Sequence, residues 1–374
     1  MKIENIINRA NEFTDSLEIS EGFKLFKRSE TSAYARCFVI FIKYLLKKTD
    51  WIETRKEKLI YDLNIDLYEL YLQKINNGIN ITYDKPFLQL FCFTLSSLNI
   101  LKGNLNNKNL KILNELLDID IIESLKKKSV DTGVGASGNH SMFIGIINIY
   151  ANDYLKINRS QQIQEWIDFN SKSINLNGFW GKNKNMDYLQ FQNGYHQYEI
   201  FEYLKVTNIP WSLAAKKTML MADRYGHFAP YPGGGACYDY DATFMLTSKF
   251  VDDVGQKDVL LRTLNSITNE QNIDGGFCES RYVKKNMLPR IIKIINHILF
   301  QPSHIKIWSI LSNLNLLRFK HRHIISYWTP TNRRWDESNA WDTFFRISTI
   351  KRICDYFNLN EKNLFETNEF PGIG

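Results

Sequence analysis

The chain has 374 residues, 44% of them hydrophobic and 14% aromatic, so it can bury a large core. Its net charge of +7 suits an anionic substrate or a lipid head group. Lys and Arg are not clustered with interleaved aromatic residues, which argues against a nucleic-acid partner. Five cysteines without a CxxC pair indicate reduced thiols. Because the N-terminus has no apolar signal region and no apolar run is long enough for a bilayer, the sequence predicts a cytoplasmic protein.

Most periodic segments follow the helical period rather than alternation. Along the chain, six apolar helices follow Gly-rich or polar loops, in the segments 32–46, 85–101, 135–151, 191–204, 233–250 and 333–350. Conventional amphipathic helices are expected between them, at 54–75, 108–127, 160–171, 211–224, 256–271 and 303–318. Helices that are apolar all round must be covered on both faces. The pattern therefore predicts an all-α chain in which residues 1–374 form a single α/α toroid of six inner and six outer helices.

A basic, apolar segment at about 281–300 interrupts this repeat. In "KKNMLPRIIKIINHILF", residues 284–300, one helical stripe is apolar and includes Ile291, Ile295, Ile298 and Leu299. Lys, Arg and His residues, including His297, occupy the rest of the helix. The segment fits an extra packed helix or an amphipathic helix that rests on a membrane. The second alternative predicts peripheral membrane contact.

Two aspartates begin the helix in "GGGACYDYDATFML", residues 233–246. Asp239 and Asp241 would lie at the mouth of the toroid, where inner helices start. A carboxylate at a helix start can serve as a cap, or it can be kept for chemistry. Tyr238 and Tyr240 flank the pair and are candidate substrate-binding residues.

Three further motifs accompany "DYDAT" (239–243), which resembles the Asp-x-Asp-Asp-Thr motif of class II terpene cyclases. "NEQNIDGGFCES" (269–280) is similar to the QW repeat of squalene-hopene cyclases, and "INLNGFWG" (174–181) is a weaker copy. "SNAWDTFFRI" (338–347) resembles the Ser-x-x-Trp-Asp-Thr opening of their inner helices. The chain thus resembles the squalene cyclase and protein prenyltransferase superfamily, whose fold is an α/α toroid. Ala242 replaces the last acid of the cyclase motif.

This resemblance implies acid-initiated carbocation chemistry on an isoprenoid or lipid-linked substrate. Asp241 would match the acid that protonates an alkene or epoxide, with Asp239 beside it. Aromatic faces stabilise cations, and Trp180, Trp341 and the adjacent Asp342 are substrate-binding candidates. No cofactor is expected. Cys237 and Asp239 stand in the reverse order of the prenyltransferase zinc ligands, so a metal is not supported.

A second set of residues favours a different chemistry. Asn139 and His140 open one inner helix, and Tyr195 and His196 open the next, with Tyr198 close behind. This order resembles toroidal polysaccharide lyases of the alginate lyase and heparinase type. There, Asn and His mask a uronate carboxylate and Tyr is the acid/base, which would give those roles to Asn139, His140 and Tyr195. His196 and Tyr198 would contact the saccharide.

The sequence therefore favours an enzyme of the terpenoid cyclase kind. A lyase- or epimerase-like enzyme acting on an acidic saccharide is the first alternative. A non-catalytic binding toroid is the second, since fold does not fix function.

Overall fold

The computed structural model describes residues 3–132, 135–182, 186–253, 255–282, 287–301, 303–317, 323–359, 363–367 and 370–372. The chain divides into two compact units, each described by itself below. Unit 1 comprises Met1–Lys47, Asn185–Tyr188 and Pro210–Thr367. Unit 2 comprises Lys48–Lys184, Leu189–Ile209 and Asn368–Gly374.

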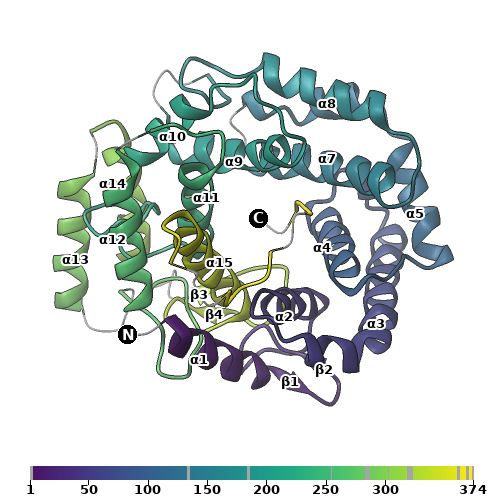
Figure 1. Cartoon of the computed structure of the whole chain (residues 1–374), viewed down its shortest axis with the longest axis horizontal. Coiled ribbons are helices and arrows are strands. Elements are labelled where there is room, and N and C mark those ends of the chain that lie inside the picture. The colour runs from purple at the N-terminus through teal and green to yellow at the C-terminus, as the bar shows by residue number, and fades with distance from the viewer. Residues whose placement is uncertain are drawn as a thin grey trace. The chain divides into compact units, whose positions relative to one another are not determined.

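The described residues contain fifteen α-helices and four two-residue strands, so the predicted all-α class is confirmed (Figure 1). The helices of unit 1 are α1 (Ile3–Asp15), α2 (Ala33–Leu45), α10 (Trp211–Met219), α11 (Ala236–Thr247), α12 (Gln256–Thr268), α13 (Met287–Phe300), α14 (Ser303–Leu317) and α15 (Ala340–Tyr356). Its strands form two antiparallel pairs, β1 (Glu18–Ile19) with β2 (Gly22–Phe23) and β3 (His323–Ile324) with β4 (Arg333–Arg334).

Unit 2 is helical in all its described elements. They are α3 (Thr49–Asn76), η1 (Ile81–Tyr83), α4 (Lys85–Leu101), α5 (Asn107–Leu117), α6 (Ile121–Lys127), η2 (Val130–Thr132), α7 (Ser137–Asp153), α8 (Ser160–Lys172) and α9 (Tyr188–Tyr203). The first residue of α9 is grouped with unit 1.

Each unit combines helices that are buried all round with helices that bury one stripe. In unit 1, residues 34–43 of α2 and 340–350 of α15 are all buried. In unit 2, residues 87–98 of α4 and 140–151 of α7 are all buried, whereas α3 buries only a stripe around Leu59, Leu63 and Leu67. This alternation matches the predicted apolar and amphipathic helices.

One helix that the sequence predicts forms two separate helices in the structure. The segment 108–127 forms α5 and α6, because the Asp120 carboxylate accepts a hydrogen bond from the Glu123 N–H at 2.7 Å and caps a new helix. The helix expected at 211–224 ends at Met219, and Asp223 lies in the turn that follows. The N-terminal helix α1 lies outside the expected set.

The two QW-like segments form the same turn in different units. The N–H groups of Asn175 and Asn272 donate to the carbonyl four residues ahead, at 2.7 and 2.9 Å. Three residues after each asparagine, Gly178 and Gly275 have φ of +80° and +88°, a conformation that favours glycine. A Cβ on Gly275 would also lie 2.1 Å from the carbonyl oxygen of Arg9. The repeated turn supports an internal repeat.

Candidate functional site

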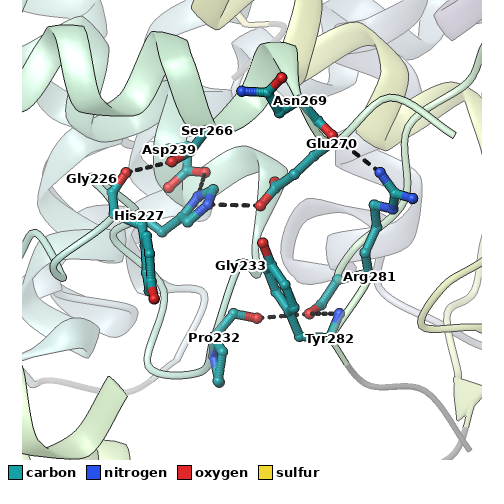
Figure 2. Close-up of polar contacts among 12 residues, drawn as sticks. Gly226, His227, Pro232, Gly233, Asp239, Ser266, Asn269, Glu270, Arg281 and Tyr282 are labelled. Carbon is teal, nitrogen blue, oxygen red and sulfur yellow. Dashed lines mark hydrogen bonds and ion pairs between the residues drawn. The ribbon is translucent and has the colours of Figure 1, made fainter. Parts of the chain in front are cut away.

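The core of unit 1 holds a buried charge network where α11 and α15 pack together. The Asp239 carboxylate accepts hydrogen bonds from His227 Nδ1 at 2.8 Å and the Phe228 N–H at 2.9 Å, and it pairs with the Arg346 guanidinium. His227 Nε2 lies 3.0 Å from Glu270 Oε1, so the ring sits between two carboxylates (Figure 2). All four side chains are buried. This network joins α11 and α15 to the loop before α11, which carries His227, and to the loop after α12, which carries Glu270.

The network places the carboxyl groups of Asp239 and Glu270 against His227 and Arg346. Burial alone would lower the pKa of His227, but the carboxylates of Glu270 and Asp239 raise it well above its ordinary value. Burial would also lower the pKa of Arg346, and the same two carboxylates raise it. Burial would raise the pKa of Glu270, yet His227 lowers it. These shifts favour the ionised forms of His227, Arg346 and Glu270, which suits a structural network rather than proton donation.

The glycine run before α11 has a structural role in this network. Gly233 and Gly235 have φ of +57° and +67°. The Gly233 carbonyl accepts a hydrogen bond from Arg346 Nη2 at 3.3 Å, and Gly235 precedes the first residue of α11. The run bends the chain so that Asp239 enters the core one turn later.

A second buried cluster surrounds the start of α15. Arg333 donates to Glu279 Oε2 and to Asn339 Oδ1, both at 3.0 Å, and its Nη1 lies 3.7 Å from Asp342 Oδ2. Asn339 caps α15 by accepting from the Asp342 N–H at 2.9 Å, and its amide donates to Asp342 Oδ2. Asp342 Oδ1 has no hydrogen-bond partner among the described residues. The Tyr231 hydroxyl donates to Glu279.

The pKa of Asp342 is shifted in the opposite direction to that of Glu270. Its side chain is fully buried, and this burial raises its pKa to about 7, although Arg333 opposes the shift. A carboxyl group with this pKa exists in both forms at neutral pH. Its protonated form holds a proton of the kind that a general acid donates.

Asp241 and Cys237 lie with this second cluster. Asp241 is buried, whereas Cys237 and Tyr238 are half-buried. Burial raises the pKa of the Cys237 thiol well above its ordinary value, and so do the charges of Asp241, Glu279 and Asp342. The thiol therefore stays protonated. Among the described residues, no three His, Cys, Asp or Glu side chains are placed to hold a metal ion.

Aromatic rings gather around the first turns of α15. Trp341 lies 4.4 Å from Trp328 and 4.5 Å from Phe345 between ring centroids. Phe345 lies 5.3 Å from Tyr240 of α11, and Trp341 lies 5.0 Å from Phe38 of α2. Tyr240 and Trp328 are half-buried. Unit 1 thus contains six of the predicted residues: Asp239, Asp241, Tyr238, Tyr240, Trp341 and Asp342.

The remaining predicted residues belong to unit 2, where His140 lines a pocket of about 230 Å³. The same pocket is lined by Tyr83, Lys85, Lys127 and Lys128. The His140 ring stacks on Tyr83 at 5.4 Å, and Lys127 Nζ lies 4.1 Å from the Tyr83 ring centroid. Three lysines that line a pocket together with the Tyr83 and His140 rings favour an anionic ligand.

Asn139 and Tyr195 do not line this pocket. Asn139 Nδ2 lies 2.9 Å from His196 Nε2, and Tyr195 is fully buried with its ring 5.3 Å from the His196 ring. The predicted Asn–His–Tyr set is therefore split, with only His140 at the pocket. Burial, then Lys128, lowers the pKa of His140 to about 4, so it is neutral at pH 7. The positive charge of the pocket comes from its lysines.

Tyr198 and Trp180 are both buried and bonded to backbone. The Tyr198 hydroxyl donates to the Gly178 carbonyl, and Trp180 Nε1 donates to the Asn170 carbonyl at 2.9 Å. Their polar groups are satisfied by the QW-like turn and the end of α8. These contacts give both residues a packing role.

The pKa of His140 makes the stability of the protein depend on pH. Between pH 6.5 and about 4 the unfolded chain binds a proton at this histidine that the folded chain does not, so the free energy of unfolding decreases as the pH is lowered through this range. The contribution is about 3 kcal/mol for a shift from 6.5 to about 4. His140→Gln should lose less stability than wild type on acidification, as denaturant titrations at the two ends of this range would measure. Equal losses in both proteins would contradict the assigned shift.

Several residues of the buried clusters were missing from the sequence prediction. They are His227, Glu270, Glu279, Arg333 and Arg346. One signal was available: Arg346 interrupts an otherwise apolar helix body, and a buried arginine requires acids nearby. The sequence did not show which acids those are.

No family model, curated protein or solved structure matches this chain. In the part of the chain that the structure describes, no helix has the length and apolar character needed to cross a membrane.

Proposed function

We propose that the chain is a terpenoid cyclase-like enzyme in which Asp342 protonates a carbon–carbon double bond of an isoprenoid or lipid-linked substrate. The proposal includes the single α/α toroid that the sequence predicts. The observation that carries it is the Asp342 carboxyl group, which is buried, has a pKa of about 7 and leaves Oδ1 without a hydrogen-bond partner among the described residues.

The proposed step transfers the Asp342 proton to an alkene carbon. A C–H bond forms, the π bond breaks and a carbocation results. Ring closure and transfer of a proton from carbon to solvent then give a product isomeric with the substrate, and the Asp342 carboxylate takes up a proton from solvent. The aromatic cluster around Trp341 and Phe345 supplies π faces that stabilise cations without attacking them.

This assignment places the acid at Asp342 rather than at Asp241, the residue the cyclase resemblance suggested. Asp342 belongs to the Ser-x-x-Trp-Asp-Thr-like motif and has the raised pKa that proton donation needs. Asp241 then acts as a neighbouring carboxylate whose charge also reaches Cys237. Asp239 is committed to His227 and Arg346.

Solvent deuterium tests the proposal. Squalene and all-trans-geranylgeraniol, each in detergent micelles, are the probes for turnover in D₂O. A cyclised isomer that carries one non-exchangeable deuterium on carbon is expected, because the proton of Asp342 comes from solvent. Absence of any isomeric product from both probes, or a product without carbon-bound deuterium, would contradict acid initiation.

The pocket of unit 2 favours a second candidate, binding of an acidic saccharide. Its support is the lysine-rich lining around Tyr83 and His140. Binding of oligomannuronate, measured by calorimetry, should weaken about tenfold or more in Lys127→Ala. If oligomannuronate binds and is converted to an unsaturated uronate, the lyase alternative replaces the cyclase proposal.

A further inference from the structure

The outward face of α13 is apolar. Ile292, Ile295 and Leu299 are 54%, 50% and 61% exposed, and their spacing places them on one side of the helix. The inward face packs through Ile294 and His297, and His297 Nδ1 lies 3.2 Å from the Asp223 carboxylate. From the sequence, His297 was placed outside the apolar stripe, and the structure buries it. Lys284, Lys285 and the side chains of 287–290 lie outside the described residues.

The next helix, α14, has the same arrangement. Ile307, Leu311 and Leu314 are 68%, 54% and 51% exposed and follow one stripe, with Trp308 exposed beside them. Asn313, on the buried side, donates to the Pro230 carbonyl at 3.1 Å and fixes the orientation of the helix. A helix on a globular surface normally exposes its polar side. Here the apolar side chains of both helices are the exposed ones. The two helices pack against each other (Figure 1).

The sequence around these helices is uniformly basic. Residues 280–335 contain eleven Lys and Arg and no Asp or Glu. The whole chain has 47 Lys and Arg and 40 Asp and Glu. The residues outside 280–335 therefore contain 36 Lys and Arg and 40 Asp and Glu. The positive charge of the chain therefore comes entirely from this segment. A one-signed basic segment with an apolar face is complementary to anionic lipid head groups above acyl chains.

We propose that the outward faces of α13 and α14 dock on the surface of a membrane rich in anionic lipids. The exposed isoleucines and leucines enter the boundary between head groups and acyl chains. Trp308 lies at the level that tryptophan prefers, and Lys306 contacts the head groups. This inference goes beyond the proposed function and does not depend on it.

Sedimentation with vesicles tests the docking. Wild-type protein should bind vesicles of phosphatidylglycerol and phosphatidylcholine in equal parts at least about tenfold more strongly than vesicles of phosphatidylcholine alone, and added salt should weaken this binding. Leu311→Ser/Leu314→Ser should reduce the partition coefficient by about tenfold or more, because each leucine loses apolar area that the membrane would cover. Lys306→Glu should also reduce it.

Two matched variants control for the substitutions themselves. Leu261→Ser removes a leucine of α12 that is 50% exposed, and Lys257→Glu reverses an exposed charge on the same helix. Both should bind vesicles like wild type. Equal binding by all variants, or no vesicle binding by wild type, would overturn the proposal. A dimer that Leu311→Ser/Leu314→Ser dissociates, with no vesicle binding by wild type, would instead assign the surface to a second copy.

Discussion

Arg346→Met should destabilise unit 1 by about 3–5 kcal/mol, the cost of removing one partner from a buried ion pair. Arg346 is buried, and it balances Asp239 and Glu270 together with His227. Without its charge, two buried carboxylates share one cation. Methionine keeps much of the volume of the side chain, so the loss of stability reports charge rather than a cavity. Hydrogen exchange of peptides from α11 and α15, which carry Asp239 and Arg346, measures this loss of stability.

Lys351→Met on the same helix is the matched control. Lys351 pairs with Asp355 at 2.7 Å, and the Asp355 side chain is 41% exposed. Such a pair contributes about 1 kcal/mol or less. If Arg346→Met costs no more than this control, the buried network does not hold unit 1 together as proposed.

Asp342→Asn should reduce turnover of the isoprenoid probes by about 10²- to 10⁴-fold, the range for loss of a general acid. An amide keeps the shape of the side chain but has no acidic proton. Asp336→Asn, which changes a half-buried carboxylate of the preceding loop, should leave turnover unchanged. Asp342→Asn activity equal to that of Asp336→Asn would exclude Asp342 as the acid.

Stability separates this role from a structural one. Because the folded-state pKa of Asp342 is raised to about 7 from an ordinary 3.8, the folded chain holds a proton that the unfolded chain has released. The carboxyl group therefore costs stability as pH rises from about 4 to 7, and the cost persists above 7. Asp342→Asn should unfold at a temperature no lower than wild type above pH 7. A carboxylate that mainly anchored α15 would give the opposite result.

The helical class could be predicted because a helix that is buried on all sides has an almost entirely apolar sequence. The apolar bodies of α2, α4 and α7 are nearly free of charged residues, and the stripes of α3 follow the helical period. The break between α5 and α6 was missed because capping by Asp120 is a local choice that the apolar period does not reveal.

The candidate site was predicted less completely. Asp239 and Asp241 were singled out because acids before an apolar run need a reason to be there. Their partners could not be predicted, since His227 and Arg346 reach Asp239 from 12 and 107 residues away. Burial and the charge of Glu279 raise the pKa of Asp342, whereas Arg333 and Asn339 oppose the rise. Its motif was visible in the sequence, but this environment exists only in the folded chain.

Infrared difference spectroscopy between about pH 6 and pH 8 tests the central claim most directly, because few ordinary carboxyl groups titrate in that range. Wild type and Asp336→Asn should show a protonated-carboxyl C=O band that disappears as pH rises through about 7. Asp342→Asn should lack the band. If no carboxyl group titrates there, or if the band persists in Asp342→Asn, Asp342 is not the proton donor.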